Sequence, residues 1–160
     1  MPNSLQDISD TVSRDRIENL HPDAMQVFID AFVEMQALYP DLRITDAYRT
    51  IQEQNDLYNI GRGEDDDRSV VTNARGGSSY HNYGLAIDVV RVTDGQANYE
   101  GTSYEDLADI CEKYGLEWGG NWDSFPDQPH FQITYGFSID ELYQKYQNGE
   151  VDENGYVILE

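Results

Sequence analysis

Residues 85–92 constrain the fold most, because they form a strand-like run of branched residues with a carboxylate inside it. Side chains alternate along an extended strand, so three apolar residues face one side: Leu85, Ile87 and Val89. Asp88 faces the other side, where the small side chain of Ala86 leaves room beside it. An unpaired buried charge is costly, so we expect Asp88 to meet a cation or strong hydrogen-bond donors.

The rest of the chain alternates irregularly between helical and extended patterns. The spacing of apolar residues and the capping signals predict helices at about residues 24–38, 51–60, 103–115 and 138–148. Strands are predicted at residues 42–48, 85–92, 116–118 and 130–135, with an edge strand in the tail, 150–160. We therefore predict an α+β fold, with a small antiparallel sheet flanked by helices. The length fits one domain, 1–160, with peripheral segments at 1–20, expected to be loosely packed, and 150–160.

The charge of the chain excludes several classes of partner. There are 31 Asp and Glu residues against 10 Lys and Arg, a formal net charge of −21. Such a surface repels phosphate backbones and anionic membranes, so we expect neither nucleic acid nor membrane as a partner.

No segment is apolar and long enough to span a bilayer, and we see no secretory signal. The single cysteine, Cys111, excludes an intrachain disulfide and is expected to be a buried apolar residue.

Two of the three histidines lie in settings that suit a metal. His81 precedes a predicted bend that leads into the Asp88 strand, and His130 follows prolines and begins another strand. If these strands pair, two imidazoles and one carboxylate converge and leave a tetrahedral zinc ion one open position. From spacing alone, a hydrogen-bonded structural pair is about equally supported. An iron oxygenase site is disfavoured, because its acid follows the first histidine by two residues instead of seven. His21, at a predicted helix start, is expected to be structural.

Two spaced motifs resemble those of the M15 peptidases: Ser79-x-His81-x-x-Gly84-x-Ala86-x-Asp88 and Asp127-x-x-His130. This family contains D-Ala-D-Ala carboxypeptidases and dipeptidases, and L-alanyl-D-glutamate endopeptidases that include phage endolysins. The likeness extends through residues 45–50, 54–58, 71–77 and 117–120 and covers most of the chain. It implies the D-Ala-D-Ala carboxypeptidase/Hedgehog-like fold, and residues 71–88 are most similar to the L-alanyl-D-glutamate branch.

The resemblance also implies roles for individual residues. His81, Asp88 and His130 match the zinc ligands, Asp127 matches the catalytic acid/base, and Arg49 matches an arginine that stabilises the oxyanion. Many family members have glutamate where this chain has Asp127, which is a partial departure.

Other residues near the motifs have less defined roles. Ser79 and Gln132 match neighbours that support the ligands. Glu117 is a second candidate for the proton carrier, ranked below Asp127 because Asp127 has the spacing to the ligand. Trp122 and Tyr83 either line a substrate groove or pack in the core.

The expected activity is therefore zinc-dependent hydrolysis of the peptidoglycan stem peptide, between L-alanine and D-glutamate. The alternatives are D,D-carboxypeptidase or dipeptidase activity, or a non-catalytic wall-binding domain that keeps zinc for structure. We expect a monomer whose partner is the stem peptide. With no secretory signal, we expect it to stay in the cytoplasm until lysis or a non-classical export route brings it to the cell wall.

Overall fold

The computed structural model describes residues 2–160 and has one five-stranded antiparallel sheet with helices around it. The strands are β1 (Leu42–Asp46), β2 (Ala86–Thr93), β3 (Gln96–Asn98), β4 (Glu117–Trp118) and β5 (His130–Gln132). The α-helices are α1 (Thr11–Glu18), α2 (Met25–Leu38), α3 (Ile51–Asn59), α4 (Tyr104–Glu112) and α5 (Ile139–Gln147). Three short 3-10 helices complete the set: η1 (Leu5–Asp7), η2 (Tyr80–Tyr83) and η3 (Gly119–Asn121). The predicted α+β fold is confirmed.

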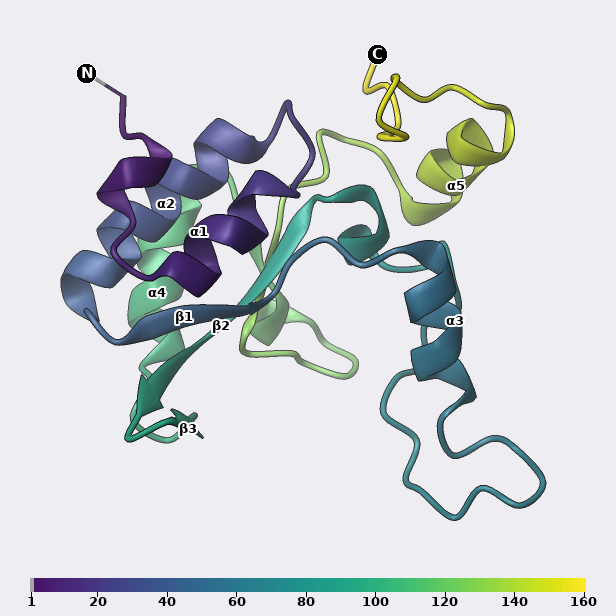
Figure 1. Ribbon diagram of the computed structural model, residues 1–160, viewed down its shortest axis with the longest axis horizontal. Helices are drawn as coiled ribbons and strands as arrows, with labels where there is room; N and C mark the ends of the chain where they lie inside the picture. The colour runs from purple at the N-terminus through teal and green to yellow at the C-terminus, as the bar shows by residue number, and fades with distance from the viewer. Residues whose placement is uncertain (1) are drawn as a thin grey trace.

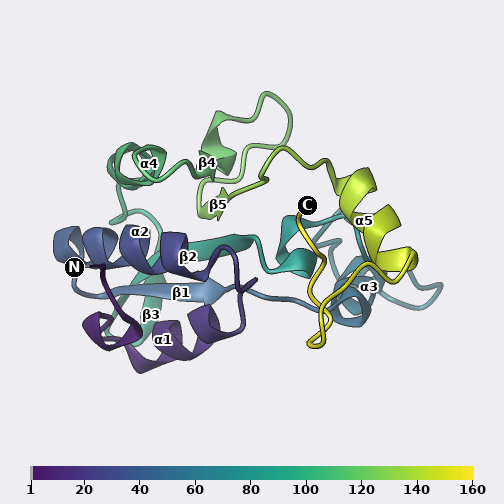
Figure 2. The same cartoon turned by 90° about the horizontal axis from the view of Figure 1, so that it is seen from above.

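The elements form two groups along the molecule. Figures 1 and 2 show α1, α2 and α4 beside the sheet at one end, with α3 and α5 at the other. The loop that follows α3 extends away from the remaining chain (Figure 1). The short helix η2 directly precedes β2 in the chain. No helix within residues 2–160 has both the length and the apolar character needed to cross a membrane.

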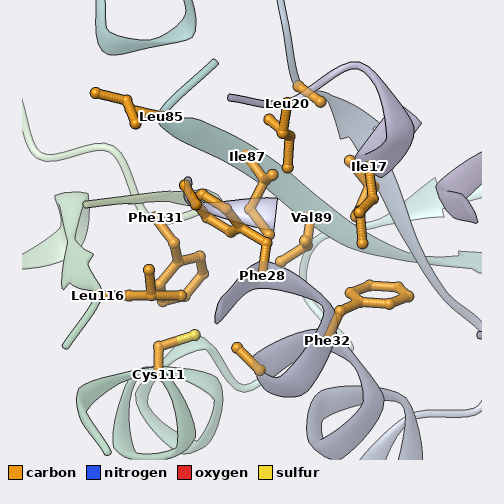
Figure 3. Close-up of a cluster of buried hydrophobic side chains, with 14 of the residues drawn as sticks. Ile17, Leu20, Phe28, Phe32, Leu85, Ile87, Val89, Cys111, Leu116 and Phe131 are labelled. Atoms are coloured by element: carbon orange, nitrogen blue, oxygen red, sulfur yellow. The ribbon is translucent and has the colours of Figure 1, made fainter. Parts of the chain in front are cut away.

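Strand β2 lies at the centre of the sheet, and one of its faces packs into the apolar core. It pairs with β1, β3 and β5. Ile87 and Val89 are fully buried and belong to the core, together with Phe28 and Phe32 of α2 and Phe131 of β5 (Figure 3). The alternation predicted for residues 85–92 is confirmed, and it leaves Asp88 on the face away from these core residues.

Cys111 packs in the same core from α4, as expected, and is fully buried (Figure 3). Burial among apolar groups raises the pKa of its thiol to about 12. The thiol is therefore protonated at neutral pH and takes part in packing rather than in chemistry.

The expectation of a loosely packed N-terminal segment is wrong. Residues 11–18 form α1, and Ile8, Ile17 and Leu20 are buried to 1% exposure or less. Asp10 caps the helix by accepting hydrogen bonds from the backbone and hydroxyl of Ser13. Only a few apolar residues hold this helix to the core, so the apolar periodicity was too sparse to reveal it.

Two other elements differ from the prediction. The tail forms one isolated bridge, between Val151 and Val157, in place of an edge strand. Strand β3 was not predicted. It follows β2 through the turn Asp94-Gly95, where both residues have positive φ angles, 52° and 78°. An Asp-Gly pair is a strong hairpin signal, so this turn could have been found in the sequence.

The bend before β2 lies where it was predicted, and it depends on the conformation of Gly84. Gly84 ends η2 with a φ angle of 71°, which favours glycine. A Cβ atom at this position would lie 2.4 Å from the backbone nitrogen of His21. That nitrogen donates to the Gly84 carbonyl at 2.9 Å, and the His21 Nε2 donates to the Val157 carbonyl at 2.6 Å. His21 is thus buried and hydrogen-bonded, in agreement with a structural role.

Candidate metal centre

Three side chains from separate elements meet at one end of β2. His81 extends from η2, Asp88 from β2 and His130 from β5. The Oδ1 atom of Asp88 lies 3.3 Å from His81 Nε2 and 3.1 Å from His130 Nδ1. One candidate ligand atom from each residue lies within 4.8 Å of the other two. The predicted convergence of these residues is therefore present, and the group has the composition of a metal site.

The local sequence explains why these residues meet. Antiparallel pairing of β2 with β5 places Asp88 directly opposite His130. The Ser79 hydroxyl accepts a hydrogen bond from the His81 backbone and caps η2. The left-handed Gly84 then reverses the chain, so that η2 folds back over the beginning of β2.

Hydrogen bonds orient both imidazoles so that a free nitrogen faces Asp88. His81 Nδ1 is 2.7 Å from the Ala47 carbonyl oxygen, which can only accept, so this nitrogen carries the proton. His130 Nε2 is 2.7 Å from the amide oxygen of Gln132. The amide nitrogen of Gln132 donates to Glu117 at 3.2 Å, which fixes the direction of the amide. In their neutral forms, His81 Nε2 and His130 Nδ1 thus direct lone pairs towards Asp88.

This arrangement fits a divalent metal ion. Two imidazole lone pairs and a carboxylate oxygen repel one another unless protons or a cation lie between them. Atoms bound to a tetrahedral zinc ion at about 2.0–2.1 Å lie about 3.3 Å apart, which is close to the two distances to Asp88. The histidine side chains are 4% and 6% exposed, whereas Asp88 is 24% exposed. The group is therefore enclosed on the histidine side and open towards solvent at Asp88.

The electrostatics of Asp88 agree with a carboxylate that stays ionised. Burial acts to raise its pKa, but a proton shared with each of His130 and His81 outweighs burial and holds the pKa well below its usual range. A bound metal ion would take the place of these protons. An ionised carboxylate is the form that binds a metal ion.

Arg49 and Asp127 line the same cavity as the three candidate ligands. The cavity has a volume of about 810 Å³. Arg49 pairs with Asp46 and donates to the amide oxygen of Gln54 at 2.7 Å. Asp127 is exposed at the rim of the cavity, and partial desolvation there, together with the negative charge of Asp88, raises its pKa. Both residues predicted for catalysis thus lie beside the candidate metal group.

Some of the remaining predicted residues line the cavity, and others do not. Ser79, Gln132 and Trp122 line the cavity, and the Trp122 ring centroid is 5.2 Å from that of His130. Tyr83 is buried and donates its hydroxyl to the Gly77 carbonyl at 2.6 Å, so the packing interpretation holds for it. Glu117 lies outside this cavity and contacts Gln132 instead.

Two features of the site were not predicted. Gln54 is fully buried and joins Arg49 to the carbonyl of Ala74, in the loop after α3. Phe125 and Val71 also line the cavity although both are highly exposed. The capping box predicted the start of α3 but not which of its side chains is buried, and the two exposed residues carry no periodic signal.

The chain is similar to known proteins in sequence and in fold. A family model described as D-alanyl-D-alanine carboxypeptidase matches residues 72–133. The chain is 40% identical to the peptidoglycan L-alanyl-D-glutamate endopeptidase CwlK of Bacillus subtilis over 103 residues, 58% of this chain and 60% of that protein. The chain thus spans about 60% of the length of this relative. The resemblance to M15 peptidases is confirmed by these matches.

Solved structures show the same fold at lower identity. The L-Ala D-Glu endopeptidase ChiX of Serratia marcescens aligns with a TM-score of 0.55 at 24% identity, over 82% of this chain and 96% of that one. A zinc complex of the vancomycin-resistance D,D-pentapeptidase VanY, an E175A mutant from a VanB-type cassette, aligns with a TM-score of 0.55 at 15% identity, over 78% of each chain. The expected D-Ala-D-Ala carboxypeptidase-like fold is confirmed.

Proposed function

Because the chain resembles the M15 peptidases in sequence and in fold, we propose that it is a zinc peptidase that cuts the peptidoglycan stem between L-alanine and D-glutamate. The name of the Bacillus subtilis relative supports this bond, and the VanY complex with Zn(II) supports this metal.

One observation carries the proposal: two hydrogen-bonded imidazoles turn their free nitrogens towards one ionised carboxylate. His81, Asp88 and His130 would hold the metal ion. When bound, zinc supplies Lewis-acid chemistry, because it polarises a carbonyl and lowers the pKa of water to about 7. The Ala47 and Gln132 oxygens hold the two imidazoles in the tautomers that leave the required nitrogens free.

The chain itself supplies the proton carrier and a second positive charge. The Asp127 carboxylate accepts the proton of the attacking water and delivers it to the leaving amine nitrogen. Its raised pKa suits a group that must both accept and release a proton. The guanidinium of Arg49, held by Asp46 and Gln54, stabilises the negative charge that develops on the carbonyl oxygen.

Digestion of purified sacculi tests the proposal. The zinc-loaded protein should create new N-terminal D-glutamate residues, identified by mass spectrometry of the released peptides. A chelator should abolish the products, and added zinc should restore them. A protein that holds zinc but creates no new termini would instead be a wall-binding domain.

A second activity is favoured by the description of the matching family. That description is D-alanyl-D-alanine carboxypeptidase, and it covers the segment that contains all three candidate ligands. The same digestion separates the two activities, because a carboxypeptidase releases free D-alanine and leaves the bond between L-alanine and D-glutamate intact.

A further inference from the structure

Phe125 combines two features that are unfavourable in the free protein. Its side chain is 80% exposed, which leaves a large apolar ring in water. Its φ angle is 52°, in the left-handed region that bulky residues rarely adopt. Pro126 follows directly, and a residue before proline favours an extended conformation instead. A strained conformation of this kind persists where the surrounding structure maintains it, often for a function.

The position of Phe125 indicates what that function is. Phe125 lines the cavity that contains Arg49, Asp127 and the candidate metal ligands. Other apolar residues border the same cavity, among them Leu57, Val71 and Trp122. Val71 and Trp122 are 60% and 38% exposed. The cavity therefore combines charged groups suited to chemistry with apolar side chains that are partly exposed to water in the free protein.

We propose that Phe125 is a substrate-contacting residue whose ring packs against an apolar part of the stem peptide, such as an alanine methyl group. This inference rests on the proposed function and names a specificity determinant for it. The strained backbone holds the ring over the cavity, so its burial is gained only when a peptide is bound. The protein thus loses some stability at Phe125 in exchange for tighter substrate binding.

The chain provides a matched control for this proposal. Tyr135 is also an aromatic residue with a positive φ angle, 51°, and is 42% exposed. It does not line the cavity, and its hydroxyl donates to the Asp23 carbonyl at 3.1 Å. Glycine relieves a positive φ angle at either position. Phe125→Gly and Tyr135→Gly therefore both relieve a positive φ angle and differ in their place relative to the cavity.

The experiment compares kcat, KM and Tm of the zinc-loaded proteins, with a soluble stem peptide as substrate. Both glycine variants should unfold within a few degrees of the wild type, because relief of strain offsets the added freedom of the unfolded chain. Phe125→Gly should lower kcat/KM about 10-fold, mainly through KM, because it removes contacts made in the ground state. Tyr135→Gly should keep wild-type kinetics. Phe125→Leu should retain part of the binding, whereas Phe125→Asn, which tolerates the same φ angle, should not.

Three outcomes would overturn the inference. The first is a kcat/KM for Phe125→Gly within twofold of the wild type. The second is an equal loss of activity in Tyr135→Gly, and the third is a large drop in the Tm of Phe125→Gly, which would assign the ring a structural role. If the wild type cleaves no stem peptide, the proposed function fails. The affinity for the same peptide, measured by isothermal titration calorimetry, then tests the role of Phe125. Weaker binding by Phe125→Gly than by the wild type supports the contact, and equal or absent binding rejects it.

Discussion

At the scale of single residues, the two candidate histidine ligands use different ring nitrogens. His81 presents Nε2 to Asp88, and His130 presents Nδ1. In each ring the other nitrogen donates a hydrogen bond to an oxygen, the Ala47 carbonyl or the Gln132 side-chain amide. Neighbouring oxygens that fix the tautomer also raise the basicity of the ligand. The candidate metal centre therefore depends on Ala47 and Gln132 as well as on the three candidate ligands.

Removal of either imidazole should remove the metal. We expect His81→Ala and His130→Ala to purify with little zinc and no peptidase activity, because a pair of remaining ligands holds zinc weakly. Metal analysis of protein shown to be folded by circular dichroism measures this. Stoichiometric zinc in either variant would contradict the assignment of that histidine as a ligand.

Asp127 should be separable from metal binding. Asp127→Asn retains the size of the side chain but cannot accept a proton, so we expect a zinc content like the wild type and at least about 100-fold slower turnover. Asp123→Asn is the matched control, because Asp123 is an exposed acid nearby in the chain that does not line the cavity. Wild-type rates in Asp127→Asn would remove it from the mechanism.

At the scale of elements, the sequence predicted most clearly the helices and strands that carry a local signal, such as a capping box or an alternation of apolar residues, which the packing of the fold does not override. The capping boxes at Thr50 and Ser138 marked the starts of α3 and α5, and the alternation in β2 placed Asp88 correctly. Helix α1 was missed because its contribution to the core is small. Phe125 was missed because a positive φ angle before proline has no sequence signature.

The contact between α1 and β1 carries a stability prediction. Asp10 caps α1 and pairs with both Nε and a terminal nitrogen of Arg43, at 3.0 and 2.9 Å. We expect Asp10→Ala to lower the free energy of unfolding by about 1–2 kcal/mol, because it removes a cap and an ion pair. Asp10→Asn can still cap the helix, so it should cost less. Urea denaturation of the three proteins measures the difference, and equal midpoints would reject this role.

The same residue predicts a dependence on pH. The hydrogen bond from Arg43 lowers the pKa of Asp10 in the folded protein, despite partial burial. The stabilisation is therefore complete above the unfolded pKa of about 3.9 and is lost as the pH falls through the lower folded value. We expect the stability of Asp10→Asn to decrease less than that of the wild type between about pH 5 and pH 2. Parallel curves for the two proteins would contradict the shift.

At the scale of the whole molecule, a net charge of −21 must be accommodated on one small protein. Like charges on a surface repel one another and destabilise the compact state. Salt screens this repulsion, with a Debye length of about 30 Å at 0.01 M and about 3 Å at 1 M.

We expect the Tm of the zinc-saturated protein to rise by several degrees between about 0.01 and 0.5 M NaCl, because screening weakens the repulsion between carboxylates. Differential scanning calorimetry measures the shift, with KCl as a second neutral salt and a sugar of equal osmolality as the uncharged control. A Tm that stays constant or falls would mean that attractive ion pairs, such as Arg91 with Asp41, outweigh the repulsion.

Hydrogen bonds around His21 connect the C-terminal segment to the turn that carries His81. The Val157 carbonyl binds the imidazole of His21, whose backbone nitrogen binds Gly84 at the end of the turn that carries His81. A deletion that removes Val157 would therefore remove the hydrogen-bond acceptor of this imidazole. The turn at Gly84 would then be held less firmly. The affinity for metal would then be sensitive to residues that do not line the candidate cavity.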